Sequence, residues 1–213
     1  MVDQGQKGYC VAATMERAMR YYGRDMDQHE MAQMAETSAA KGTDPRSMVE
    51  VLRKLGVSLG CKIHVLEDFK PAEFVKMINK YNSMAKDKGK PEITFGQVID
   101  IGAVYQSFDL DTFKALRAKE KSDMKRFQGY PEKYVKQGIP LMWSVFAGLV
   151  EENPPLPGMG GHMRMIIGYN LKTQEILYTD TWGPGHEIKR LPLADAWTIT
   201  LGVYVVEPRS TTM

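Results

Sequence analysis

The chain has 213 residues, a mass of 24.1 kDa and a formal net charge of +2 at pH 7, with 43% hydrophobic and 25% charged residues. This composition excludes a disordered chain, and the small net charge argues against nucleic acid or another obligate polyanionic partner. The longest apolar run, residues 139–150, is interrupted by Pro140 and Gly148 and is shorter than the roughly 20 residues that span a bilayer. The sequence therefore predicts one soluble globular domain, residues 1–213, without a membrane span and with the oligomeric state left open.

Three amphipathic helices are predicted in the first third of the chain. The first begins at Cys10 and is closed by Gly23, and its apolar side chains recur every three or four residues. These side chains are Val11, Met15, Ala18, Met19 and Tyr22. Asp27 and Glu30 form a capping pair for the second helix. The apolar residues of that helix are Met31, Met34 and Ala35.

The third helix is followed by the first predicted strand. Thr43 or Asp44 caps this helix, Pro45 suits its first turn, and Gly56 ends it. Its apolar stripe consists of Met48, Val51, Leu52 and Leu55. The strand has alternating polarity, which predicts one buried face and makes Cys61 a core residue. Its apolar members are Cys61, Ile63 and Val65, and its polar members are Lys62 and His64.

Residues 67–130 are predicted as a helical insertion, because strand-like segments return only after them. One helix of this insertion carries Phe74, Met77, Ile78 and Tyr81, and another begins with Leu110, Phe113 and Leu116. The strand-like segments of the remainder are 139–146, 162–170, 175–182 and 196–208. The sequence thus predicts an α+β fold, in which a helical half (1–66) packs on an antiparallel sheet from a β-rich half (131–213).

Cys10 stands where the first helix begins, which is a position that favours a reactive thiol. A thiol acts as a nucleophile only as thiolate, and a helix N-terminus and a nearby imidazolium both stabilise that form. His162 is the best candidate base, since it follows a glycine-rich stretch and starts a predicted strand. We expect Gly160 and Gly161 in that stretch to leave room for a substrate backbone.

Two further side chains complete the predicted chemistry. Asp180 follows the next strand, and an antiparallel hairpin between the two strands would place it beside His162, where a carboxylate fixes the imidazole tautomer. Gln4 can supply an amide donor for an oxyanion beside the Cys10 N–H. Gln6 competes with Gln4 for this role, and His186 competes with His162.

Each of these residues also has a purely structural interpretation. A cysteine at a helix start is often a small buried hydrophobe. Asp180 could cap a turn, and Trp182 could be ordinary core. The functional interpretation is favoured because Gln, Cys, Gly-His and Asp-x-Trp-Gly occur together and in order.

Three motifs carry a resemblance to a known family, namely "QGQKGYC" (4–10), "GGHMRMIIGYN" (160–170) and "YTDTWG" (178–183). With them the sequence resembles papain-like cysteine peptidases, specifically the bacteriocin-processing, double-glycine-leader peptidases and their stand-alone relatives. The resemblance implies a papain-like fold, a Cys10–His162–Asp180 triad and an oxyanion hole at Gln4. It also implies that Trp182 shields the His–Asp pair, and that the partner is a peptide or protein substrate.

The sequence also departs from this family. Val11 stands where many members have glycine after the nucleophile, and residues 67–130 have no counterpart in the minimal domain. No metal or organic cofactor is implied. The chain starts three residues before Gln4, which suggests a trimmed N-terminus and favours an extracytoplasmic location, periplasmic or secreted. An amidase or transglutaminase-like acyl transferase with the same triad and a catalytically silent peptide-binding module remain alternatives.

Overall fold

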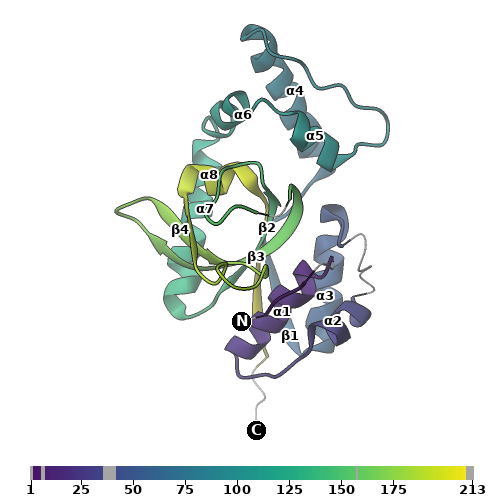
Figure 1. Cartoon of the computed structure of the whole chain (residues 1–213), viewed down its shortest axis with the longest axis vertical. Helices are drawn as coiled ribbons and strands as arrows, with labels where there is room; N and C mark the ends of the chain where they lie inside the picture. Colours follow the sequence, from purple (N-terminus) through teal and green to yellow (C-terminus); the bar gives the residue numbers. More distant parts are fainter. Residues whose placement is uncertain (1, 6–7, 36–41, 157, 210–213) are drawn as a thin grey trace.

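A computed structural model describes residues 2–5, 8–35, 42–156 and 158–209, and it contains a six-stranded sheet (Figure 1). The strands run in the order β1-β6-β2-β3-β4-β5, and every pair of neighbours is antiparallel. Their bounds are β1 Cys61–Glu67, β2 Leu141–Ala147, β3 Gly160–Asn170, β4 Glu175–Thr179, β5 Lys189–Pro192 and β6 Thr200–Pro208. The predicted α+β class is confirmed.

The three N-terminal helices cover one face of the sheet. They are α1 Cys10–Tyr21, α2 Gln28–Met34 and α3 Met48–Ser58, and a short 3-10 helix, η1 Pro45–Ser47, precedes α3. The Asp27 carboxylate accepts hydrogen bonds from the N–H groups of His29 and Glu30, which confirms the predicted N-cap of α2. The apolar faces of these helices form one core with side chains from four strands, namely Cys61, Met142, Met163, Met165, Tyr204 and Val206.

The remaining helices form a second core with the other face of the sheet. Their bounds are α4 Pro71–Asp87, α5 Ile101–Ser107, α6 Leu110–Arg117, α7 Lys121–Tyr134, η2 Val135–Gln137 and α8 Leu193–Ile199. Figure 1 shows α4, α5 and α6 beyond one end of the sheet, while α7 and α8 lie beside it. The ring of Tyr105 on α5 stacks on Phe146 of β2 at a centroid distance of 4.4 Å. Residues 67–130 therefore share a core with the sheet, and their separate status as an insertion stays a prediction.

The prediction that Gly56 ends the third helix is wrong. Helix α3 continues to Ser58, and the turn follows at Gly60, which has a φ of 61°. A Cβ on Gly56 would lie 2.7 Å from Cγ1 of Ile63. Glycine is therefore needed inside the helix because β1 packs closely against it.

The alternation predicted for the first strand holds for Cys61, which is 2% exposed, but is wrong for Val65, which is 37% exposed. Val65 pairs with Tyr204 in the same register as the residues before it, and the register shifts only after Val65. It therefore stays on the face of Cys61 and Ile63, and the exposure of that face increases along the strand. The alternation predicts which side chains share a face, but not how far along the strand that face is covered.

The predicted strand 196–208 is wrong over its first four residues, which belong to helix α8, and β6 begins only at Thr200. A short apolar run does not distinguish a buried strand from a buried helix. The chain passes from α8 to β6 at Thr200. The Thr200 hydroxyl accepts a hydrogen bond of 2.9 Å from the indole N–H of Trp143 on β2. Strand β5 was not predicted. Within the described ranges, no helix is both long and apolar enough to cross a membrane.

Candidate active site

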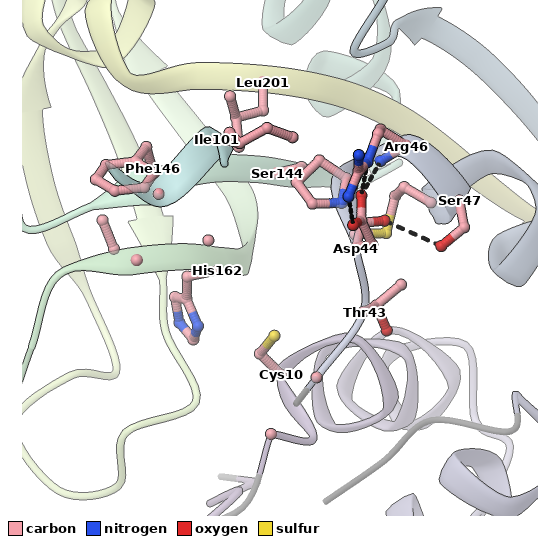
Figure 2. A pocket seen from close by; sticks show the side chains of 18 of the residues that line it. Cys10, Thr43, Asp44, Arg46, Ser47, Ile101, Ser144, Phe146, His162 and Leu201 are labelled. Carbon is pink, nitrogen blue, oxygen red and sulfur yellow. Dashed lines mark hydrogen bonds and ion pairs between the residues drawn. The ribbon is translucent and has the colours of Figure 1, made fainter. Parts of the chain in front are cut away.

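A cleft of about 1220 Å³ separates the N-terminal helices from the start of β3 and the helical segment around α5. Gln4, Cys10, His162 and Trp182 line one part of it. Its other walls come from η1 and its flanks, from the ends of β2 and β6, and from residues 98–102. In Figure 2, Cys10 on α1 and His162 on β3 come from different sides of this space.

Cys10 is the first residue of α1, so its backbone lies where a helix has unsatisfied N–H groups. The N–H of Ala13 donates to the carbonyl of Tyr9 at 2.8 Å. The side chain of Cys10 lies at the edge of the cleft and is 9% exposed. Val11 points away from the cleft into the core and is 1% exposed. The larger residue after the cysteine therefore fills the core and does not narrow the cleft.

His162 and Asp180 are brought together by the hairpin of β3 and β4. These strands pair antiparallel, with Met165 opposite Thr179 and Asn170 opposite Glu175, as the hairpin prediction requires. Nε2 of His162 hydrogen-bonds Oδ1 of Asp180, and both side chains are buried. Because Nε2 is engaged with Asp180, Nδ1 is the ring nitrogen left to interact with the Cys10 thiol.

The electrostatics of these three side chains favour an ion pair. Burial alone would raise the pKa of the Cys10 thiol, but a hydrogen bond and the charge of His162 outweigh burial, and the pKa is lowered. Burial alone would lower the pKa of His162, but the charge and hydrogen bond of Asp180 raise it to about 9. The pKa of Asp180 is depressed despite burial, because His162 and Arg164 stabilise the carboxylate. This arrangement supports a thiolate beside an imidazolium at neutral pH.

Trp182 covers the His162 ring. The two rings stack with a centroid distance of 4.9 Å and an interplanar angle of 23°. The aromatic face limits the contact of water with the hydrogen bond between His162 and Asp180. The shielding role that the family resemblance implies for Trp182 stays a prediction.

Gln4 is held beside Cys10 by the segment that follows β4. Its N–H donates to the carbonyl of Thr181 at 2.9 Å, and its Oε1 accepts from the Thr181 hydroxyl at 2.6 Å. With Oε1 engaged in this way, the amide presents Nε2 as its hydrogen-bond donor. Thr181 therefore fixes both the backbone and the side chain of Gln4.

The structure requires glycine at position 183, the last residue of the "DTWG" motif. Its φ is 79°, a conformation that favours glycine, and a Cβ there would lie 2.6 Å from Oδ2 of Asp3. Asp3 and Trp182 form an isolated β-bridge at this point. The glycine thus permits the close approach of the N-terminal segment that carries Gln4.

Gly160 and Gly161 both line the cleft at the start of β3. For either residue, no described heavy atom lies within 4 Å of where a Cβ would stand, apart from atoms of adjacent residues. A side chain at these positions would therefore project into open space beside His162. That this space receives a substrate backbone stays a prediction.

The competing residues are placed differently. Gln6 lies outside the described residues. His186 is in the loop after β4 and does not line the cleft, and its backbone carbonyl accepts the Asp180 N–H at 3.0 Å. Among the described residues, no group of three or more His, Cys, Asp or Glu side chains is arranged to hold a metal ion.

Sequence reasoning missed Thr181 and a set of buried charges behind Asp180. Arg164, Glu152 and Lys189 are all buried in the described structure. Arg164 could have been noticed, because an arginine two residues after His162 on one strand shares its face. The partners Glu152 and Lys189 lie on other segments, and the sequence carries no signal that joins them.

The chain is similar to known proteins over nearly its whole length. A sequence model described as "Peptidase_C39 like family" matches residues 1–204. A search of curated proteins finds no match. Among solved structures, the peptidase domain of Streptococcus ComA, a bi-functional ABC transporter involved in a quorum-sensing pathway, is similar with a TM-score of 0.43 and 10% identity, covering 98% of this chain and 96% of that one. Xylellain, a cysteine protease from Xylella fastidiosa, is similar with a TM-score of 0.46 and 14% identity, covering 98% and 82%.

Proposed function

The chain belongs to the Peptidase_C39-like family, and on this premise we propose that it is a thiol-dependent peptidase that hydrolyses peptide bonds through Cys10, His162 and Asp180. One observation carries the proposal. The buried His162–Asp180 pair adjoins a cysteine at a helix N-terminus, and the pKa of that cysteine is lowered although the side chain is buried.

In the proposed reaction, the Cys10 thiolate attacks the carbonyl carbon of the scissile bond and forms a tetrahedral intermediate. His162, already protonated beside the thiolate, gives its proton to the leaving amine as the C–N bond breaks. Water then attacks the thioester, His162 takes a proton from it, and the acid product leaves Cys10. Asp180 keeps the imidazole in one orientation and stabilises its charged form.

The oxyanion of each intermediate would be bound by Nε2 of Gln4 and by the N–H of Cys10. The N–H of Cys10 lies in the first turn of α1, where the helix supplies no carbonyl partner for it. Thr181 holds Gln4 in place before substrate arrives, so the donor need not reorganise during the reaction. The four predicted site residues and this hydroxyl together account for the proposed chemistry.

The cleft is suited to an extended chain as substrate. The glycines at the start of β3 carry no side chains and leave open space beside His162, where the backbone of an extended peptide could lie. Residues 98–102, which precede and begin α5, form another wall of the same cleft. We therefore propose that the segment 67–130 contributes to the choice of peptide.

Limited alkylation near neutral pH tests the proposal. Iodoacetamide is added below the thiol concentration, and the label is mapped by mass spectrometry. We expect Cys10 to be labelled in preference to Cys61, whose pKa is raised by burial, and we expect the preference to be lost in His162→Ala. The same protein should cleave members of a fluorogenic peptide library, and Cys10→Ser should cleave none. Equal labelling of the two cysteines in the wild type would overturn the proposal.

A further inference from the structure

A fully buried arginine lies behind the candidate triad. Arg164 follows His162 by two residues on β3, and its side chain is 0% exposed. Its Nε lies 3.0 Å from Oδ2 of Asp180, while Oδ1 of Asp180 binds His162 and accepts the N–H of Thr181 at 2.9 Å. The two carboxylate oxygens of Asp180 thus have different partners.

The charge of Arg164 is in turn balanced by Glu152, in the segment after β2. Nη2 of Arg164 lies 3.0 Å from the carboxylate of Glu152, and Nζ of Lys189 on β5 lies 3.0 Å from Oε2 of the same group. Tyr178 on β4 donates its hydroxyl hydrogen to Glu152. The side chains of Arg164, Glu152 and Lys189 are at most 1% exposed. Burial on this scale is tolerated only for charges that are paired.

The charges alternate in sign from the cleft into the interior. In the ion-pair form, the order is Cys10 thiolate, His162 imidazolium, Asp180 carboxylate, Arg164 guanidinium, Glu152 carboxylate and Lys189 ammonium. The guanidinium also lies over two aromatic rings, since its centre is 4.8 Å from the ring centroid of Tyr178 and 6.0 Å from that of Trp143. Arg164 has little freedom to move away from Asp180.

We infer that Arg164 is a positioning residue of the candidate triad, because its guanidinium forms an ion pair with the second carboxylate oxygen of Asp180, and Glu152, itself paired with Lys189, balances the charge of Arg164. This inference rests on the proposed function, since it assigns a residue to the same site. Arg164 touches neither the cleft nor the Cys10 sulfur, so it acts on the reaction only through Asp180.

The charge of Arg164 affects both the acidic and the alkaline limb of the pH profile of hydrolysis. The positive guanidinium favours the thiolate of Cys10 and disfavours the imidazolium of His162, so removing this charge raises the pKa of both groups. Removing the negative charge of Glu152 lowers both. Other polar and charged groups around Asp180 and Arg164 come from α1, from β4 and from the loop after β4, namely Arg17, Tyr178, His186 and Glu187. They stay the same in every variant below.

The test measures the rate of Cys10 alkylation by iodoacetamide from pH 5 to 10, with mass mapping of the label, together with peptide hydrolysis over the same range. In Arg164→Met we expect both limbs of the hydrolysis profile and the midpoint of the alkylation curve to move upward by about one pH unit. This is the effect of removing one unit charge that is separated from His162 by Asp180, at an effective dielectric constant of about 20. Lys189→Met should move them upward by less, and Glu152→Gln should move them downward. Arg117→Met removes another buried arginine, one that lies over Trp197 away from the cleft, and should leave the profile in place.

Opposite directions for opposite charges are the decisive result, because a purely structural role would lower thermal stability without a sign-dependent shift. If Arg164→Met does not fold, the signs of the Glu152→Gln and Lys189→Met shifts decide. Folded variants with the wild-type profile, or shifts of one common direction, overturn the inference while leaving the proposed function intact. The proposed function itself fails by a different result, namely a wild type whose Cys10 labelling does not depend on His162.

Discussion

Removing the Gln4 side chain should slow hydrolysis without making the thiol less reactive. The backbone of Gln4 is held by its own N–H bond to Thr181 and by the neighbouring Asp3–Trp182 bridge, so Gln4→Ala should keep the N-terminal segment in place. Loss of one oxyanion donor costs about 2.7–4 kcal/mol of transition-state stabilisation. We therefore expect kcat to fall by a factor of about 10² to 10³ in Gln4→Ala.

Thr181 offers a graded version of the same experiment. Thr181→Val keeps the shape of the side chain but removes the hydroxyl that donates to Oε1 of Gln4 over 2.6 Å. A hydrogen bond of this kind contributes about 1 kcal/mol, so we expect hydrolysis to slow by about fivefold as the amide loses its fixed orientation. Thr181→Ser restores the donor and should retain most of the activity.

Alkylation provides the internal control for both positions. Displacement of iodide by a thiolate forms no oxyanion, so the rate of Cys10 alkylation by iodoacetamide should stay at the wild-type value in Gln4→Ala and Thr181→Val. The assay is to measure hydrolysis of one fluorogenic peptide and alkylation on the same preparations. If hydrolysis and alkylation fall by the same factor, Gln4 acts on the thiolate or on the fold, and the oxyanion assignment is refuted.

Three further predictions concern pH and packing. The pKa of His162 is raised to about 9, so peptide hydrolysis should decline only as the pH rises through about 9, where the proton for the leaving amine is lost. A hydrolysis rate that declines near pH 6.5 would contradict the ion-pair assignment. Gly161→Leu should raise KM for peptides several-fold, because the new side chain enters the cleft. The melting temperature should not change, because the Cβ meets no described atom within 4 Å beyond adjacent residues, and enzyme kinetics with calorimetry checks both expectations. Gly148→Ala should instead lower the unfolding free energy by about 1–3 kcal/mol, as measured by urea titration. Its φ is 80° and the new Cβ would lie 2.9 Å from the backbone of Gly158 and Met159, so a wild-type urea midpoint would show that this loop yields freely.

Local signals in the sequence predicted the elements that depend on local physics. The Asp27 cap is a contact over two or three residues, and the apolar spacing of Val11, Met15 and Met19 directs α1 to its core wherever that core lies. The hairpin of β3 and β4 is equally local, because a short turn leaves only one way for adjacent strands to pair. The eighteen residues from His162 to Asp180 form one such hairpin, so this local pairing alone predicts that the two side chains lie together, as they do.

The errors arose where distant segments meet. Gly56 looks like a helix terminator in the sequence, but it is an interior residue that lets Ile63 on β1 come close. Val65 keeps the alternating register in its pairing with β6, but it is 37% exposed, so its burial depends on which distant segments cover that face. Residues 196–199 have strand-like composition but form the end of helix α8, where all four side chains are buried. In so short an apolar run, the intrinsic preference for a β-strand is weaker than the packing of these side chains in the core.

The sequence by itself determined the order of the chemical groups and the local geometry that presents them. A cysteine at a helix start, a histidine opening a strand and an aspartate closing the next one are each placed by a cap, a turn or a strand period. The tertiary structure decided what these groups experience, because pKa values depend on burial and on charges from other segments. Arg164 is one residue of a strand in the sequence, and only the fold brings Glu152 and Lys189 to it and sets all three behind Asp180.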